Sequence, residues 1–181
     1  MRVITGKYKG RRFDVPRTFK ARPTTDFAKE NLFNVLNNLL DFEDIDVLDL
    51  FSGTGSISYE LASRDALHIT AIEMSEKHIS YIRKMCTDLK IDNIRVMRQD
   101  VFRYLSSTQT SFDLIFADPP YQLENINDIP DYVFRHNHLN PDGLLIVEHG
   151  AKTSFENHPN FVNHRNYGNV HFSFFKLKVE S

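Results

Sequence analysis

The sequence predicts a doubly wound α/β fold, and three observations support this prediction. From Asp46 onward, short apolar runs alternate with stretches of helical periodicity, as in βαβ units around a parallel sheet. A glycine-rich turn follows the first apolar run. Late in the sequence, Gly168-Asn169 is typical of a two-residue hairpin turn. We therefore expect a mainly parallel sheet that closes with an antiparallel pair.

The segment before the sheet is predicted to contain a hairpin and a helix. Residues 1–16 alternate loosely around two glycines, which indicates a small hairpin. Thr25 or Asp26 can cap the helix that follows. Apolar residues spaced three and four apart over residues 28–40 predict about four helical turns.

Five apolar runs are predicted to be strands, and three amphipathic stretches between them to be helices. The runs cover residues 47–51, 67–72, 94–97, 112–117 and 144–147. The helical stretches cover residues 57–61, 79–89 and 129–134. Two further strands, over residues 163–167 and 170–179, flank the hairpin turn.

The composition is that of one globular domain. The chain has 181 residues, of which 41% are hydrophobic and 25% charged. No apolar run approaches the roughly 18 residues of a membrane helix, and the N-terminus lacks the apolar core of a secretory signal. We therefore expect a cytoplasmic protein with no membrane partner. Cys86 is the only cysteine and the eight histidines show no ligand spacing, so no metal is predicted.

Positive charge is concentrated in the first 25 residues. They hold eight Lys and Arg against one acidic residue, giving +7, so with a net charge of −2 the other 156 residues sum to −9. A cationic segment on an acidic body indicates contact with a polyanion, the alternative being a solvated hairpin that binds nothing. We therefore divide the chain into a basic arm, residues 1–25, and a domain, residues 26–181.

The first predicted strand ends in Asp49-Leu50-Phe51-Ser52-Gly53-Thr54-Gly55-Ser56, and the part after Leu50 is a glycine loop. Gly53 and Gly55 allow a tight turn and the close approach of a ligand beside a helix N-terminus. Ser58 stands where a dinucleotide fingerprint has its third glycine, and Asp49 precedes the loop. A carboxylate at that point suits a cationic ligand better than a pyrophosphate.

Two more acidic residues follow the next two strands. Glu73 ends the second strand, where a carboxylate can accept hydrogen bonds from both hydroxyls of a ribose, and we expect it to be accessible to solvent. Asp100 follows the third strand, in position to meet a nucleobase amine. Together with the glycine loop, these residues predict that this edge of the sheet binds a positively charged nucleoside. S-adenosylmethionine (SAM) fits this description better than a nicotinamide dinucleotide does.

The most specific signal is Asp118-Pro119-Pro120-Tyr121, at the end of the fourth strand. An exocyclic base amine is a poor nucleophile because its lone pair is delocalised into the ring. The Asp118 carboxylate and the Pro119 carbonyl can hold its two N–H groups and aim the lone pair at a methyl group. Pro120 helps to keep that carbonyl rigid, and Tyr121 can stack on an unstacked base. The alternative is a rigid turn capped by Asp118, with Tyr121 in the core.

The chain resembles the bacterial 16S rRNA (guanine-N2-)-methyltransferase family of the RsmD type, among the SAM-dependent amino-methyltransferases. The specific likeness lies in residues 2–12 and in Arg22-Pro23-Thr24-Thr25-Asp26 with residues 32–36, while residues 49–55 and 118–121 match motifs of many base methyltransferases. The likeness covers nearly the whole chain. Thr5 stands where relatives often have glycine, and the chain lacks a long charged C-terminal tail.

The resemblance implies a role for each motif. Asp49, Gly53 and Gly55 would hold the methionine end of SAM, Glu73 the ribose, and Asp100 with Val101 the adenine. Asp118 and Pro119, within the catalytic motif that Pro120 and Tyr121 complete, would receive the N2 amine of a guanine in 16S rRNA. The substrate would be an assembled small-subunit particle. The charge of the arm, rather than the resemblance, assigns the RNA contacts to Lys7, Lys9, Arg11, Arg12 and Arg22.

Two other interpretations remain open at this point. One is an adenine-N6 methyltransferase that acts on DNA or RNA, since the same tetrapeptide serves that chemistry. The other is a catalytically idle RNA-binding assembly factor. Glu148 ends the fifth strand and is a candidate for lining the pocket, with no role assigned.

Overall fold

The computed structural model describes residues 1–19 and 25–178. In these residues the strands are β1 (Asp46–Leu50), β2 (His68–Glu73), β3 (Ile94–Arg98), β4 (Phe112–Ala117), β5 (Leu139–His149), β6 (Phe161–Tyr167) and β7 (Val170–Phe175). The helices are α1 (Asp26–Leu36), α2 (Ser56–Ser63), α3 (Glu76–Leu89), α4 (Val101–Ser107) and α5 (Asp128–Arg135).

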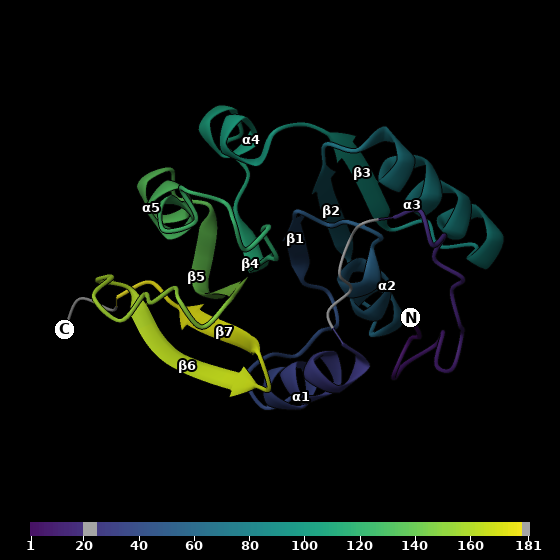
Figure 1. The fold of residues 1–181 in the computed structure, drawn as a ribbon, viewed down its shortest axis with the longest axis horizontal. Helices are drawn as coiled ribbons and strands as arrows, with labels where there is room; N and C mark the ends of the chain where they lie inside the picture. The colour runs from purple at the N-terminus through teal and green to yellow at the C-terminus, as the bar shows by residue number, and fades with distance from the viewer. Residues whose placement is uncertain (20–24, 179–181) are drawn as a thin grey trace.

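The described strands form one sheet in the order β3-β2-β1-β4-β5-β7-β6 (Figure 1). The pairs from β3 to β5 are parallel, and β7 lies antiparallel to both β5 and β6. The predicted doubly wound sheet with a C-terminal antiparallel hairpin is therefore confirmed. Gly168, in the turn between β6 and β7, has a φ of +62°, a conformation that glycine adopts readily.

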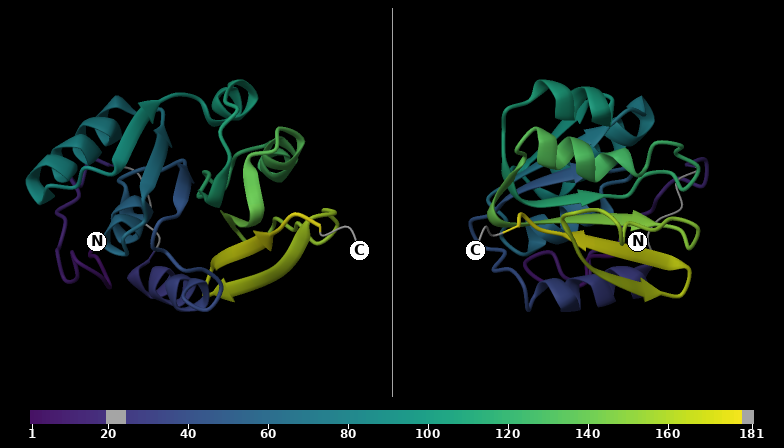
Figure 2. Two further views of the ribbon diagram at one scale, coloured as in Figure 1. Left: turned by 180° about the vertical axis from the view of Figure 1, so that it is seen from behind. Right: turned by 90° about the vertical axis from the view of Figure 1, so that its left-hand side faces the viewer.

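Helices cover both faces of the sheet (Figures 1 and 2). Side chains of α1, α2 and α3 pack on one face with Val47, and those of α4 and α5 pack on the other with Leu48 and Leu50. Successive side chains of β1 therefore point into opposite layers of the core, because side chains alternate along a strand. Within the described ranges, no helix is long and apolar enough to span a bilayer.

Two helices differ from the sequence prediction. Helix α1 begins as expected, with the Thr25 hydroxyl accepting from the Ala28 N–H at 3.1 Å, but it ends at Leu36 rather than near residue 40. Asparagines follow it, and their side chains compete for backbone hydrogen bonds, which favours helix ends. Helix α4 was not predicted. It begins where the Asp100 carboxylate accepts from the Arg103 N–H at 2.9 Å.

The N-terminal hairpin packs on α2. A single antiparallel bridge joins Arg2 and Arg12. Glu60 of α2 is fully buried, and its carboxylate accepts from the backbone N–H groups of Ile4 at 2.8 Å and Thr5 at 3.1 Å. The backbone of the hairpin is therefore fixed to the domain.

The negative charge of Glu60 is balanced inside the protein. Lys29 of α1, also buried, has its Nζ 3.8 Å from the carboxylate and donates to the Arg2 carbonyl at 2.6 Å. Arg64 Nη2 lies 3.1 Å from the other carboxylate oxygen. Burial lowers the pKa of Lys29, whereas the neighbouring Glu60 raises it. The cluster joins the hairpin, α1 and α2.

Glu60→Ala should destabilise the protein strongly, because it leaves the Lys29 ammonium buried without its carboxylate partner. We expect the free energy of unfolding to fall by about 3–5 kcal/mol, as for other buried pairs that lose one partner. Urea denaturation measures this change. Lys84→Ala, which removes the exposed pair with Asp88 in α3, is the control and should cost less than about 1 kcal/mol. Equal effects of the two substitutions would contradict the proposed importance of the cluster.

Candidate functional site

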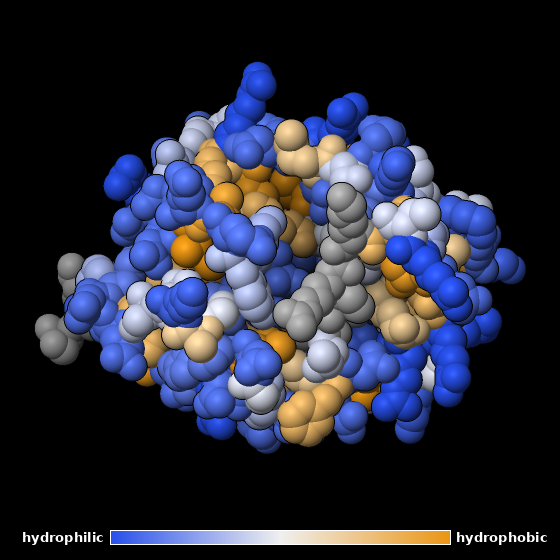
Figure 3. Space-filling view, viewed as in Figure 1, coloured by the Kyte–Doolittle hydropathy of each residue, from blue (hydrophilic) through white to orange (hydrophobic). Residues whose placement is uncertain are grey.

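A cavity of about 940 Å³ lies at the carboxyl edge of the sheet. Its walls include Gly53 after β1, Glu73 at the end of β2, Asp100 after β3 and Asp118 after β4. Parallel strands end at the same edge, so these residues converge although they are far apart in sequence. Figure 3 shows apolar residues gathered inside a hollow on the face of the molecule that Figure 1 presents. The cavity is within the size range of small-molecule sites.

Most of the predicted site residues line this one cavity. They are Gly53, Glu73, Asp100, Val101, Asp118, Pro119, Pro120 and Tyr121, together with Glu148. Asp49 and Gly55 do not line it, nor do the arm residues Lys7, Lys9, Arg11 and Arg12. Arg22 lies outside the described residues.

The glycine loop has a left-handed backbone at several positions. The φ angles are +59° at Phe51, +54° at Gly53 and +83° at Gly55. A Cβ on Gly55 would lie 2.8 Å from the ring of Tyr59, so the position has room for glycine alone. Gly55 precedes α2 and thereby turns the chain from β1 into that helix.

Glu73 stabilises the loop as well as lining the cavity. Its carboxylate accepts from the N–H groups of Gly53 at 2.8 Å, Met74 at 2.9 Å and Ser75 at 2.8 Å. Its side chain is only 12% exposed, so the expectation of a solvent-accessible carboxylate is wrong. The reason is that the backbone turns around the carboxylate. His78 Nδ1 lies 3.6 Å from the same group.

Asp49 is covered by the loop that follows it. Its side chain is buried, and its Oδ2 accepts from the Ser58 hydroxyl at 2.5 Å. Burial raises the pKa of Asp49 to about 7, against the smaller opposing effect of the hydrogen bond from Ser58. Ser58, which the sequence shows only as a missing third glycine, is thus the partner of this acid.

The motif at the end of β4 is fixed on two sides. The Asp118 N–H donates to the Leu50 carbonyl at 3.3 Å, which ties the motif to the end of β1. The Tyr121 hydroxyl donates to the buried Glu148 carboxylate at 3.1 Å. A Cβ on Gly150 would lie 3.2 Å from the Tyr121 ring. The ring is therefore held against β5 while 40% of the residue stays exposed, so Tyr121 is not a core residue.

Several cavity residues escaped the sequence analysis. They include Phe27 of α1, His78 of α3, Gln99 and Tyr167. None belongs to a motif, and each reaches the cavity through the packing of its element. Only Phe27 could have been noticed in the sequence. It is an aromatic residue directly after the start of a predicted helix and lies outside the apolar stripe of that helix, which indicates an exposed ring.

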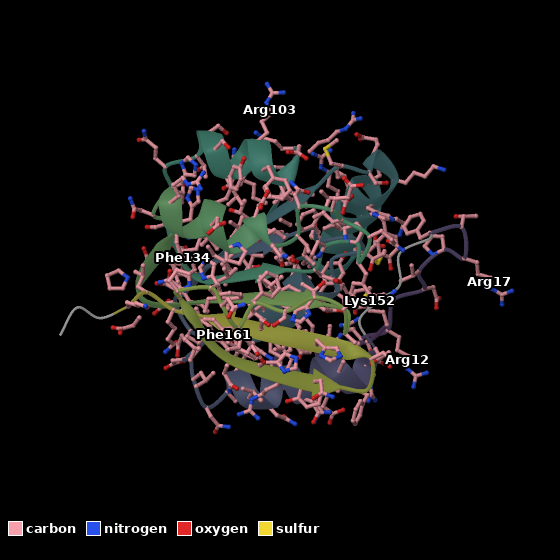
Figure 4. All side chains as sticks on the ribbon, turned by 60° about the vertical axis from the view of Figure 1, so that its left-hand side comes forward. Arg12, Arg17, Arg103, Phe134, Lys152 and Phe161 are labelled. Atoms are coloured by element: carbon pink, nitrogen blue, oxygen red, sulfur yellow. The ribbon has the colours of Figure 1, made fainter. Side chains whose placement is uncertain are left out.

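The hairpin presents its charges to solvent. Lys7, Lys9, Arg11 and Arg12 are all exposed, and Lys7 pairs with Asp65 at 3.3 Å. In Figure 4 the labelled side chains of Arg12 and Arg17 project outward, on the opposite side of the view from Phe134 and Phe161. Among the side chains that the structure describes, no group of three His, Cys, Asp or Glu could hold a metal ion.

Glu73→Ala should weaken binding of the SAM product, S-adenosylhomocysteine, and should also lower the melting temperature of the ligand-free protein. Both follow because the substitution removes a cavity carboxylate and three backbone hydrogen bonds. Loss of charged hydrogen bonds worth about 1.5–3 kcal/mol predicts roughly 10- to 150-fold weaker binding by calorimetry. Glu76→Ala, which breaks an exposed pair with Arg98 nearby, should change neither quantity. Unchanged affinity in Glu73→Ala would remove this residue from the site.

Comparison with known proteins identifies relatives along most of the chain. The family described as "Conserved hypothetical protein 95" matches residues 1–176. "Ribosomal RNA small subunit methyltransferase D" of Buchnera aphidicola is 34% identical, over 82% of this chain and 75% of that protein. "Putative rRNA methyltransferase YlbH" of Bacillus subtilis is 32% identical, over 82% of each. The family resemblance inferred from the motifs is thus confirmed.

Solved structures agree with these relatives. "Putative methyltransferase yhhF from Escherichia coli" superposes with a TM-score of 0.87 at 26% identity and covers 99% of each chain. A putative SAM-dependent methyltransferase from Streptococcus mutans shares the fold, with a TM-score of 0.66 at 17% identity over 82% of this chain and 48% of that one. The chain therefore belongs to the family described as "Conserved hypothetical protein 95", and its fold is that of the SAM-dependent methyltransferases.

Proposed function

We propose that this protein transfers the methyl group of SAM to the exocyclic N2 amine of a guanine in 16S ribosomal RNA. The observation that carries the proposal is that the glycine loop, two strand-end acids and the Asp118–Tyr121 motif share one cavity. The names of the relatives, ribosomal RNA small subunit methyltransferase D and a putative rRNA methyltransferase, support rRNA as the substrate.

The half of the cavity nearest β1, β2 and β3 fits SAM. Gly53 leaves room for a ligand against the loop backbone, and Glu73 keeps lone pairs for ribose hydroxyls beyond those its backbone donors use. Asp100 and Val101 flank the position assigned to adenine. Asp49 and Gly55 would act from behind the loop. The ionised form of Asp49 is favoured by a nearby cation, such as the ammonium of the methionine end.

The reaction needs an activated amine. The Asp118 carboxylate and the Pro119 carbonyl would accept hydrogen bonds from the two N–H groups of the amine, so that the lone pair of its nitrogen points away from the ring system. Tyr121, held by Glu148, would stack on the guanine and fix the plane of the base. Pro120 keeps the turn between acceptor and ring rigid.

When bound, SAM supplies a methyl group on a positively charged sulfur. The amine nitrogen forms the new N–C bond as the S–C bond breaks, and the electron pair of that bond leaves with sulfur as a neutral thioether. The nitrogen then loses one proton to Asp118 or to water. The negative charge of Asp118 also stabilises the positive charge that develops on nitrogen.

The arm would supply affinity for RNA. Lys7, Lys9, Arg11 and Arg12 are exposed on a hairpin whose backbone is fixed to α2, so the backbone needs no further ordering upon binding. We propose residues 1–25, Arg22 included, as the RNA-contacting unit and residues 26–181 as the catalytic unit. The substrate would be an assembled small-subunit particle in the cytoplasm.

Asp118→Ala should lower the rate of methyl transfer to small ribosomal subunits by roughly 10²–10³-fold, the loss typical when one preorganised partner of a reacting group is removed. Affinity for S-adenosylhomocysteine should stay unchanged, because Asp118 is assigned to the amine. Tritium transfer measures the rate and calorimetry the affinity. Glu124→Ala, in the exposed loop that follows the motif, is the control.

The outcome also separates the alternatives. An idle assembly factor would show no transfer with the wild-type protein, and an adenine-N6 enzyme would yield N6-methyladenosine when the product nucleosides are analysed by mass spectrometry. Equal losses of rate and cofactor affinity in Asp118→Ala would make the residue cofactor-facing, against its assignment here.

Replacing Lys7, Lys9, Arg11 and Arg12 together with Ala should weaken RNA binding and flatten its dependence on salt. If all four contact phosphates, the slope of log affinity against log salt should decrease by about 3, because each contact with single-stranded RNA contributes roughly 0.7. Filter binding across salt concentrations measures the slope. A matched set of exposed cations on other elements, Arg95, Arg103, Arg135 and Lys178, should have a smaller effect when replaced. Indistinguishable slopes for the two sets would reduce the arm to a solvated hairpin.

A further inference from the structure

The cavity has a second wall that none of the predicted motifs forms. Strand β6 runs parallel to β5, so its carboxyl end reaches the same edge of the sheet as the ends of β1 and β4. The turn from Tyr167 to Val170 therefore lines the cavity, on the side away from β2 and β3. The first turn of α1 lies beside it (Figures 1 and 2) and contributes Phe27.

Two aromatic residues meet on this wall. The rings of Phe27 and Tyr167 pack edge to face, with centroids 6.4 Å apart and planes at 86°. Tyr167 is half-buried and rests in turn on the buried Phe172, with centroids 6.2 Å apart. Phe27 is 64% exposed, the largest exposed fraction among the large hydrophobic residues that the structure describes. It is thus an apolar ring held in place from one side and open to solvent.

We propose that Phe27, supported by Tyr167, is a stacking platform for the nucleotide next to the target guanine. The proposal rests on the proposed function. A base that enters the cavity to reach Asp118 must leave its stack, so its neighbour in the RNA loses a stacking partner. An exposed aromatic ring at the rim replaces that partner and tolerates any base, because every base has a π face.

The position of Phe27 favours the neighbouring nucleotide over the target itself. Tyr121 already lies within the Asp118 motif and is held in a fixed orientation by Glu148. Phe27 comes from α1, outside the sheet, and projects most of its surface to solvent. A ring so placed contacts what remains outside the cavity when the target base is inside. Phe27 therefore acts on substrate binding, and Tyr121 on the chemical step.

The test measures KM and kcat of the full-length protein on small ribosomal subunits isolated from cells that lack its gene. Phe27→Ala and Phe27→Leu should each raise KM for the subunits about tenfold, within the range for one lost base stack. Phe27→Trp should retain the wild-type KM, since it keeps an aromatic face. In all three variants kcat and the affinity for S-adenosylhomocysteine should be unchanged. Val162→Ala, an exposed apolar residue of β6 that does not line the cavity, is the matched control.

Each other outcome overturns the inference in a recognisable way. A wild-type KM in Phe27→Leu would show an apolar contact without stacking, and a wild-type KM in Phe27→Ala would show no contact. A fall in kcat alone would place Phe27 on the target base. If the wild-type protein fails to methylate the subunits, the proposed function is wrong, and so is the role of Phe27 that rests on it.

Discussion

The N-terminal half of the molecule depends on the hydrogen bonds and ion pairs that the buried Glu60 carboxylate makes. Burying such a charge costs several kcal/mol unless its partners are in place, so Lys29, Arg64 and the backbone of the hairpin have to assemble around it together. The hairpin is thereby held in one position relative to α2, and α2 begins at the glycine loop. The same contact that satisfies one buried charge fixes the distance between the exposed cations and the cavity.

The acidic residues at the carboxyl edge of the sheet stabilise the backbone next to the cavity. Glu73 accepts hydrogen bonds from three backbone N–H groups, Asp100 caps α4, and Asp49 accepts a hydrogen bond from Ser58. A carboxylate has about four positions for hydrogen bonds, so Glu73 and Asp100, which line the cavity, are oriented by the protein and keep positions for the proposed ligand. Their orientation is set before any ligand arrives, which reduces the entropy lost on binding.

The sequence predicted the strands of the sheet and the convergence of Gly53, Glu73, Asp100 and Asp118, because the alternation of strands and helices brings strand ends to one edge. It did not predict the contacts of Glu60 with Ile4 or of Tyr121 with Glu148. Periodicity tells which face of an element is buried but not which partner meets it. The early end of α1 and the existence of α4 depended on local hydrogen bonds of Asn and Asp side chains, which hydrophobic spacing does not register.

Strand β7 pairs with β5 on one side and β6 on the other, although it follows both in the sequence. Strand β6 therefore has no neighbour in the sheet until β7 has folded back on it. The pairing of β6 with β7 joins residues that are close in sequence, so we expect it to form before the pairing of β7 with β5 and to add to β5 as one unit. Such an order of assembly would complete the wall that carries Tyr167 after the part of the sheet around the glycine loop. In a nascent chain, the cavity would then have its glycine-loop side before its Tyr167 side.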